Sequence, residues 1–146
     1  MALVLLCMLT IFMFSADTDT QSTKKSNSII IHFTEKIIGR NLTKKEKKNY
    51  VNKYDFWVRK SAHLTIYIIL GLLVISYLSE YNLTDRKMII LSIIITGLYS
   101  VSDELHQTFV SGRSCELRDI LIDTTGGIIG TYIYYFYYRI RRKLHE

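Results

Sequence analysis

Residues 88–107 read MIILSIIITGLYSVSDELHQ, and this stretch decides the fold because a long apolar run passes directly into ionisable and polar side chains. The next apolar run begins only after Arg113 and Asp119. Ionisable groups at the rim of apolar segments are costly unless they find partners or water, so they are rarely kept without a role. The stretch therefore predicts a membrane protein with a polar site built into it.

Outward from this stretch, the chain separates its apolar residues from its charged ones. Its 146 residues amount to one domain, with 49% hydrophobic residues, 22% charged residues and no proline. Most charges lie outside four apolar runs, at 2–14, 62–78, 88–101 and 120–138. A bilayer-spanning helix needs roughly 17–25 residues, so the second and fourth runs qualify alone and the others need flanking residues. We predict an all-α integral membrane protein with about four transmembrane helices; three spans is the alternative.

The first apolar run has two interpretations, a retained membrane anchor or a cleaved signal peptide. No basic residue precedes the run, and Phe14-Ser15-Ala16 is a poor cleavage site, so a retained anchor is favoured. The chain is then a single membrane domain over residues 1–146. Its expected parts are a first span at 1–15, an external loop with an amphipathic helix at 16–60, a core of three spans at 61–138 and a basic tail at 139–146.

The distribution of basic residues along the chain gives conflicting signals for its orientation in the membrane. Tyrosines between 132 and 138 are followed by a basic cluster at 139–143, a pattern typical of an aromatic belt beside a cytoplasmic positive cluster. With four spans, both termini are then cytoplasmic and residues 16–60 lie outside. That external stretch holds eleven Lys and Arg residues against six on the inner side, but the acidic Asp17 and Asp19 directly follow the first span. We expect cytoplasmic termini and a charged site on the outer face of the cell membrane.

The long first connection contains two helix signals. Apolar residues recur at three-to-four spacing over 28–38, which predicts a short amphipathic helix that ends at Gly39 and lies along the membrane surface. Thr43 and Glu46 have the spacing of a capping box, so a second helix is expected to start near Lys44 and to continue into the second span. The lysines around this start are either a solvated face or a site for anionic lipid headgroups.

Polar residues at the ends of the last three spans are spaced three or four apart, which places them on shared helix faces. If the spans alternate in direction, the end of the third span meets the starts of the second and fourth on one side of the membrane. The polar residues are therefore predicted to converge. They are Arg59, Lys60 and His63 in the second span, Asp103, His106 and Gln107 in the third, and Asp119 and Asp123 in the fourth.

The fourth span also carries glycines at packing distance. Gly126 and Gly130 form a Gly-x-x-x-Gly pair, which suits close helix packing without side chains in the way. Such packing would hold Asp119 and Asp123 near the convergent polar residues. The pair is common in apolar helices, so on its own it assigns no function.

Three motifs follow one another along the second half of the chain. They are Phe56-Trp57-x-Arg59-Lys60-x-Ala62-His63-Leu64, then Ser102-Asp103-Glu104-x-His106-Gln107-x-Phe109, then Gly112-Arg113 with Asp119, Asp123, Gly126 and Gly130. In this order, over about residues 56–138, they resemble the VanZ-like family of small bacterial membrane proteins. The resemblance implies a protein of the cell envelope, and the namesake is associated with resistance to the glycopeptide teicoplanin. It implies no reaction, and Asp123 stands where the family often has asparagine.

Two functional interpretations of the charged residues remain open, catalysis and ligand binding. For catalysis, His106 or His63 acts as general acid or base, oriented by Asp103 or Glu104, with Asp119 nearby. For ligand binding, basic side chains hold a phosphate by charge-assisted hydrogen bonds, with polar and acidic neighbours completing the site. The expected ligand-binding residues are Arg59, Lys60, Gln107, Arg113 and Asp123.

A purely structural interpretation is the alternative to both. Ion pairs from Arg59 to Asp119, from Lys60 to Glu104 and from Arg113 to Asp103 would neutralise these charges and staple three helix ends, because buried charges must be paired. The number of histidines, acids and bases exceeds what such a staple needs, which favours a functional site. A channel or transporter is disfavoured, since few polar groups lie in the middle of several spans.

The remaining residues narrow the list of partners. The two cysteines, Cys7 and Cys115, form no paired motif, and we predict no metal and no cofactor. A metal site is the weaker alternative, because no HxxxH or HxH pair occurs and the nearby basic side chains would repel a cation; its ligands would be His63, His106, Asp103 and Asp119. The net charge of +6 comes from residues that flank membrane segments, and no nucleic-acid motif is present. We expect membrane lipid and a lipid-linked or cell-wall precursor as partners, and no nucleic acid; the sequence does not indicate an oligomeric state.

Overall fold

The computed structural model describes residues 1–144, and within them every regular element is an α-helix. The predicted all-α class is confirmed. The helices are α1 (Ala2–Ser15), α2 (Asp19–Ile38), α3 (Lys44–Leu78), α4 (Asp85–Gln107) and α5 (Leu117–Lys143).

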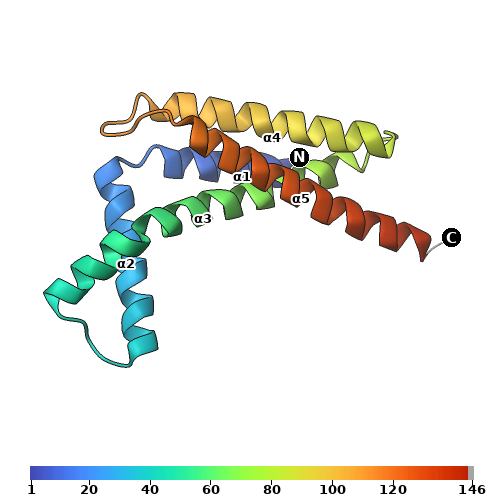
Figure 1. Ribbon diagram of the computed structural model, residues 1–146. Coiled ribbons are helices and arrows are strands. Elements are labelled where there is room, and N and C mark those ends of the chain that lie inside the picture. The colour runs from blue at the N-terminus through green and yellow to red at the C-terminus, as the bar shows by residue number, and fades with distance from the viewer. Residues whose placement is uncertain (145–146) are drawn as a thin grey trace.

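Helices α1, α4, α5 and the apolar part of α3 run alongside one another, and α2 stands across them (Figure 1). The contact between α3 and α5 is the most extensive; α4 packs on α5, α1 packs on α3 and α4, and α2 packs on α3. The α1–α2 junction and the α4–α5 loop lie at one end of this bundle, whereas the α3–α4 turn lies at the opposite end (Figure 1). The bundle thus gathers the predicted polar residues at the end where α2 crosses.

Helices α3 and α4 are each long and apolar enough to cross a membrane. A third span results if α1 and α2, bent by 102° at their junction, count as one broken span, so the predicted count of four is not confirmed. Helix α1 has 14 residues, which span about 21 Å, less than the roughly 30 Å hydrocarbon core. Helix α5 is long enough, but tyrosine, threonine and glycine replace aliphatic side chains over much of it.

Glycines allow the close approach of α3 and α5. A Cβ added at Gly130 would lie 2.0 Å from the carbonyl oxygen of Ile68, and one at Gly71 would lie 2.3 Å from that of Gly127. A side chain at either position would collide with the backbone of the facing helix, so only glycine fits there. The predicted role of the Gly126-x-x-x-Gly130 pair in close packing is confirmed.

Hydroxyl groups join α4 to α5 along the same bundle. Ser92 and Thr131 are hydrogen-bonded at 2.8 Å, and Ser100 lies 3.3 Å from the hydroxyl of Thr124. Ser92, Ser100 and Thr131 are fully buried. This pattern is expected between membrane helices, where small polar side chains hydrogen-bond across the interface.

The helix starts follow their capping signals. Helix α3 begins at Lys44 with the reciprocal Thr43–Glu46 capping box, as predicted. Helix α2 ends at Gly39, also as predicted, with φ at +74°. The helix begins at Asp19 rather than near residue 28, because a second capping box, between Thr18 and Gln21, starts it earlier.

A pH-dependent cap is expected at the exposed start of α3, outside its apolar part. The Arg40 guanidinium, together with the amide and hydroxyl of Thr43, lowers the pKa of Glu46 from 4.5 to about 2. Because the folded-state value lies below the unfolded one, the cap is at full strength above pH 4.5 and is lost as the pH falls through about 2. We expect the Thr43 amide proton to titrate near pH 2 in NMR spectra, and at higher pH in an Arg40→Gln variant. A wild-type midpoint close to 4.5 would contradict the cap geometry.

Candidate functional site

A buried polar network occupies the last turn of α4. Asp103 and Glu104 are 2% and 0% exposed, and both accept hydrogen bonds from the side-chain amide of Gln107, at 3.2 and 3.1 Å. The Ser15 hydroxyl, at the end of α1, donates to Asp103 Oδ2 at 2.8 Å. Asp103 therefore joins α1 to α4. Asp103 and Gln107 lie together as predicted, with Glu104 beside them, whereas the third predicted member, His106, does not join them.

The α4–α5 loop folds back over this network. The Glu116 amide donates to Glu104 Oε2 at 3.1 Å, and Arg113 Nη1 donates to Gln107 Oε1 at 2.8 Å. Gly112 has φ at +80°, a conformation that favours glycine and lets the loop turn just before Arg113. The loop thereby places the Arg113 guanidinium at the end of the bundle where α1, α2 and α3 also meet.

The basic residues of this end pair with partners other than those expected of a structural staple. Arg59 Nη1 lies 2.9 Å from Asp19 Oδ1, at the start of α2, and Lys60 pairs with Asp119. Within residues 1–144, Arg113 has no carboxylate at ion-pair distance. All three expected ion pairs were wrong in their partners. Of the three bases, only Lys60 joins α3 to α5.

His63 faces a fully buried carboxylate. Its Nδ1 lies 3.4 Å from Asp123 Oδ1, and the imidazole is also within electrostatic range of Asp119 and Asp103. His63 is one turn beyond Arg59 on α3, and Asp123 is one turn beyond Asp119 on α5, so the close α3–α5 packing brings the two pairs opposite each other. A histidine beside a buried carboxylate is an arrangement suited to proton transfer.

His106 lies apart from this pair. Its ring stacks on Phe12 of α1, with ring centroids 4.0 Å apart and planes 25° from parallel. The carboxylate of Asp103 instead accepts from Ser15 and Gln107, so it does not orient His106 as the sequence had suggested. Of the two histidines considered as acid or base, His63 is the one placed at a cavity.

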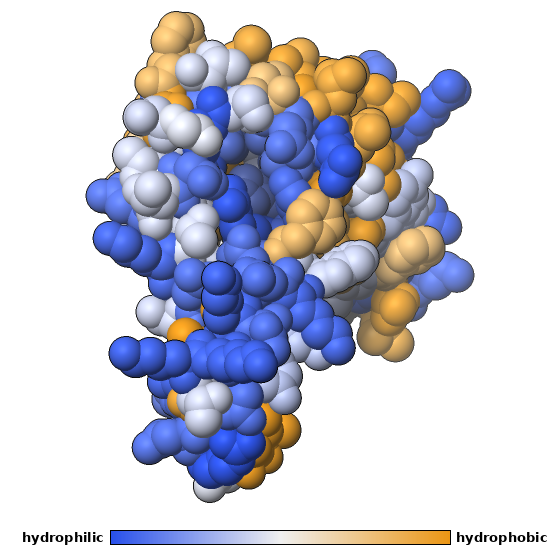
Figure 2. Space-filling view, turned by 60° about the vertical axis from the view of Figure 1, so that its left-hand side comes forward, coloured by the Kyte–Doolittle hydropathy of each residue, from blue (hydrophilic) through white to orange (hydrophobic). Residues whose placement is uncertain are grey.

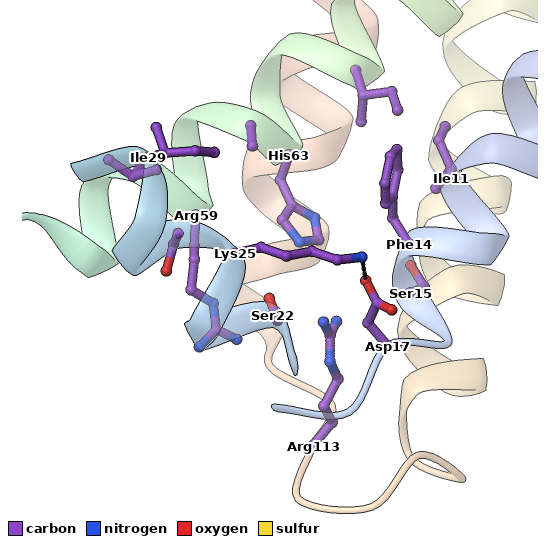
Figure 3. Close-up of a pocket in the computed structure, with 14 residues that line it drawn as sticks. Ile11, Phe14, Ser15, Asp17, Ser22, Lys25, Ile29, Arg59, His63 and Arg113 are labelled. Atoms are coloured by element: carbon purple, nitrogen blue, oxygen red, sulfur yellow. Dashed lines mark hydrogen bonds and ion pairs between the residues drawn. The ribbon is translucent and has the colours of Figure 1, made fainter. Parts of the chain in front are cut away.

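A cavity of about 330 Å³ opens between α1, α2, α3 and the α4–α5 loop (Figure 3). Its volume is at the lower end of the range for small-molecule pockets. Arg59, His63 and Arg113, all expected site residues, reach it from α3 and the loop. Six apolar side chains from α1, α2 and α3 also line the cavity: Ile11, Phe14, Ile29, Val58, Ala62 and Ile66.

The mouth of the cavity carries closely spaced positive charges. Arg113, Arg59 and Lys25 border it, with Lys25 paired to Asp17 (Figure 3). Burial lowers the pKa of the Arg113 guanidinium, and the charge of Arg59 lowers that pKa further. Both guanidinium groups line the same cavity, and two positive charges at one mouth favour the binding of an anion there. Figure 2 shows hydrophilic residues gathered on this face, around a hollow.

The cavity residues that come from the α1–α2 junction were not among the predicted site residues. Ser15, Asp17, Ser22, Lys25 and Ser26 all contribute to its wall. The Thr18–Gln21 capping box was the available signal, because it starts a helix whose first turns would carry the residues at 22, 25 and 26 on one side. The bend that folds these turns against α3 has no comparable signal.

The residues of this site do not match a metal centre. Within residues 1–144, no group of three or more His, Cys, Asp or Glu side chains is arranged to hold a metal ion. The Asp119 carboxylate is paired with Lys60, and the carboxylates of Asp103 and Glu104 accept hydrogen bonds from Gln107. These oxygens therefore face hydrogen-bond donors and not an open metal position. The arrangement can bind an anion at its mouth and move a proton at His63.

The chain matches a family model described as VanZ/LLP1 over residues 1–138. The matched range extends beyond the motifs at 56–138 and includes α1 and α2, which supply much of the cavity wall. No curated protein and no solved structure matches the chain.

Proposed function

The chain belongs to the VanZ/LLP1 family, and from this premise we propose that it is a bacterial cell-envelope membrane protein that binds a phosphate-bearing lipid or lipid-linked cell-wall precursor in the cavity. The observation that carries this proposal is the pairing of two guanidinium groups at the mouth with an apolar wall behind them. A phosphate would bind between Arg59 and Arg113, and a hydrocarbon chain would lie against Ile29 and Ile66.

The proposal includes chemistry at the bound headgroup. His63 borders the cavity and has Asp123 behind it, so it is the group best placed to act as general acid or base on a bound ester. Asp103 and Glu104 then act as positioning residues, because Asp103 holds α1 and both bond the Gln107 amide that supports Arg113. An effect on teicoplanin susceptibility would follow from a change in envelope lipid or precursor.

A non-catalytic envelope protein is the second candidate. The pairing of Lys60 with Asp119 favours it, since this contact joins α3 to α5 without needing a ligand. In that case the charged residues form a structural or partner-binding surface. The two candidates differ in whether removal of His63 alone abolishes function in a protein that is still folded.

Lipid binding is expected to depend on the two guanidinium groups. In purified protein, the Arg59→Gln/Arg113→Gln variant should bind a polyprenyl phosphate or phosphatidylglycerol at least about a hundredfold more weakly, since each of the two lost hydrogen bonds from a charged group contributes about 1.5–3 kcal/mol. Native mass spectrometry or a fluorescence titration measures this. Arg139→Gln is the matched control, because Arg139 pairs with Asp85 at the other end of the bundle. Equal affinity of the double variant and the control would show that the cavity is not the lipid-binding site.

The protein also has a definite orientation in the membrane under this proposal. We place both termini in the cytoplasm and the cavity on the outer face, where cell-wall precursors are used. This orientation is supported by the basic cluster at 139–143, which forms the C-terminal end of α5, at the end of the bundle opposite the cavity (Figure 1). A reporter fused after Glu146 should be cytoplasmic and one inserted near Thr20 should be external. Detection of both reporters on one side would refute this topology.

A further inference from the structure

A second group of polar side chains lies behind the cavity wall, inside the bundle. The Tyr67 hydroxyl, Asp103 Oδ1 and both carboxylate oxygens of Asp123 are buried and make no hydrogen bond. The three residues are 0%, 2% and 0% exposed. Buried polar atoms are hydrogen-bonded in the great majority of cases, so these four unpaired atoms require an explanation, even though the other oxygen of Asp103 accepts from Ser15 and Gln107.

These side chains come from three helices and face one interior region. Tyr67 lies on α3, one turn beyond His63, while Asp103 lies on α4 and Asp123 on α5. Tyr67 is within electrostatic range of both carboxylates, and Asp123 is within range of Asp103. The 3.4 Å approach of His63 Nδ1 to Asp123 Oδ1 connects this interior group to the cavity, into which the imidazole projects (Figure 3).

We propose that Asp103, Asp123 and Tyr67 form a proton-binding site that delivers a proton to the cavity through His63. An ionised carboxylate buried without a partner is so costly that it takes up a proton instead. A proton needs a single acceptor, whereas a metal ion needs several ligands, and the described residues offer no group of three His, Cys, Asp or Glu for one. The hydroxyl of Tyr67 can donate to a carboxylate oxygen left without a proton.

The proton moves in two steps that conserve charge. The carboxyl group of Asp123 transfers its proton from Oδ1 to His63 Nδ1, which leaves a carboxylate and an imidazolium ion. The imidazolium then releases the proton on its other nitrogen, Nε2, to an oxygen of the bound headgroup. Only this second step rests on the proposed function. The titratable and charged groups around the site are Lys60 and His63 of α3, Tyr99, Glu104 and His106 of α4, Asp119 of α5 and Arg113 of the loop.

Infrared spectroscopy of the lipid-free protein in a non-ionic detergent tests the proton site directly. At neutral pH we expect a carbonyl stretch from a protonated carboxylic acid that shifts in D₂O. Asp123→Asn should remove most of this band, Asp103→Asn should reduce or shift it, and Tyr67→Phe should shift its frequency. Asp85→Asn is the control and should leave the band unchanged, because Asp85 pairs with Arg139 at the far end.

The outcomes separate this inference from the proposed lipid site. No lipid ligand is added, so failure of lipid binding leaves the band unaffected. Absence of a protonated carboxyl band in wild-type protein, or its persistence at full strength in both Asn variants, would overturn the proton site. Loss of the band on adding sodium would overturn it too, since the carboxylates would then hold a metal cation. Melting temperatures of the variants establish whether each remains folded, and Tyr67→Phe removes only the hydroxyl group and keeps the Cβ that lies beside Gly126.

Discussion

Replacement of Gly130 by alanine is expected to destabilise the bundle by about 3 kcal/mol or more, the upper part of the range for overpacked cores. The added Cβ would lie 2.0 Å from the Ile68 carbonyl oxygen and 2.9 Å from the Leu72 amide nitrogen. Both are backbone atoms of α3, which cannot yield as a side-chain end can, so α3 and α5 must separate. Thermal unfolding in detergent, monitored by size-exclusion chromatography, measures this loss of stability.

Gly97 provides the matched control for this variant. It is also a helical glycine, on α4, but a Cβ added there would meet Thr124 Cγ2 at 3.8 Å, an ordinary contact. Gly97→Ala should therefore be neutral or stabilising by up to about 1 kcal/mol, the usual gain in helix propensity. Equal stability of the two variants would show that α3 and α5 do not pack as closely as the structure has them.

The same close packing connects stability to the site. Lys60 and His63 of α3 meet Asp119 and Asp123 of α5, and these contacts depend on the distance between the two helices. A bulkier residue at Gly130 should therefore also weaken the site. We expect lipid affinity in Gly130→Ala to fall along with the melting temperature, whereas Gly97→Ala should bind lipid as the wild type does.

Helix ends were predicted well where the residues that form the signal lie within a few positions of each other. The Thr43–Glu46 capping box and Gly39 fixed two helix ends, and both are where the sequence placed them. The identical spacing of Thr18 and Gln21 was overlooked, although it starts α2. The number of spans was harder to predict, because the length of an apolar run does not reveal the bend between α1 and α2.

The convergence of the polar residues could be predicted, whereas their pairing could not. Alternating helices bring three helix ends together, which is what the structure has. Which charges meet depends on helix rotation: at about 100° per residue, His106 points some 60° away from Asp103, on the side opposite Glu104. This rotation turns His106 toward Phe12 of α1. The partner of Arg59 was equally hidden, because Asp19 reaches it only through the α1–α2 bend.

The choice between the two histidines gives the other large expected effect. His63→Gln should lower the rate of the proposed reaction by roughly 10²- to 10⁴-fold, the usual contribution of a general acid or base. Lipid affinity should change little, since Arg59 and Arg113 remain in place. In cells, we expect His63→Gln to return teicoplanin susceptibility and envelope lipid composition to those of a strain without the protein. Immunoblots of the membrane fraction establish that the variant accumulates normally.

His106→Gln is the control that decides between an acid–base site and a structural staple. Like His63, His106 belongs to one of the three motifs and is partly buried, but its ring packs on Phe12 and does not line the cavity. The variant should keep both phenotype and lipid affinity, with at most a small fall in melting temperature from the lost stacking. If both histidine variants keep the phenotype, or both lose it only in proportion to protein level, the charged residues serve the bundle and the non-catalytic candidate stands. Loss in His63→Gln alone, at normal level, requires a group at the cavity that transfers a proton.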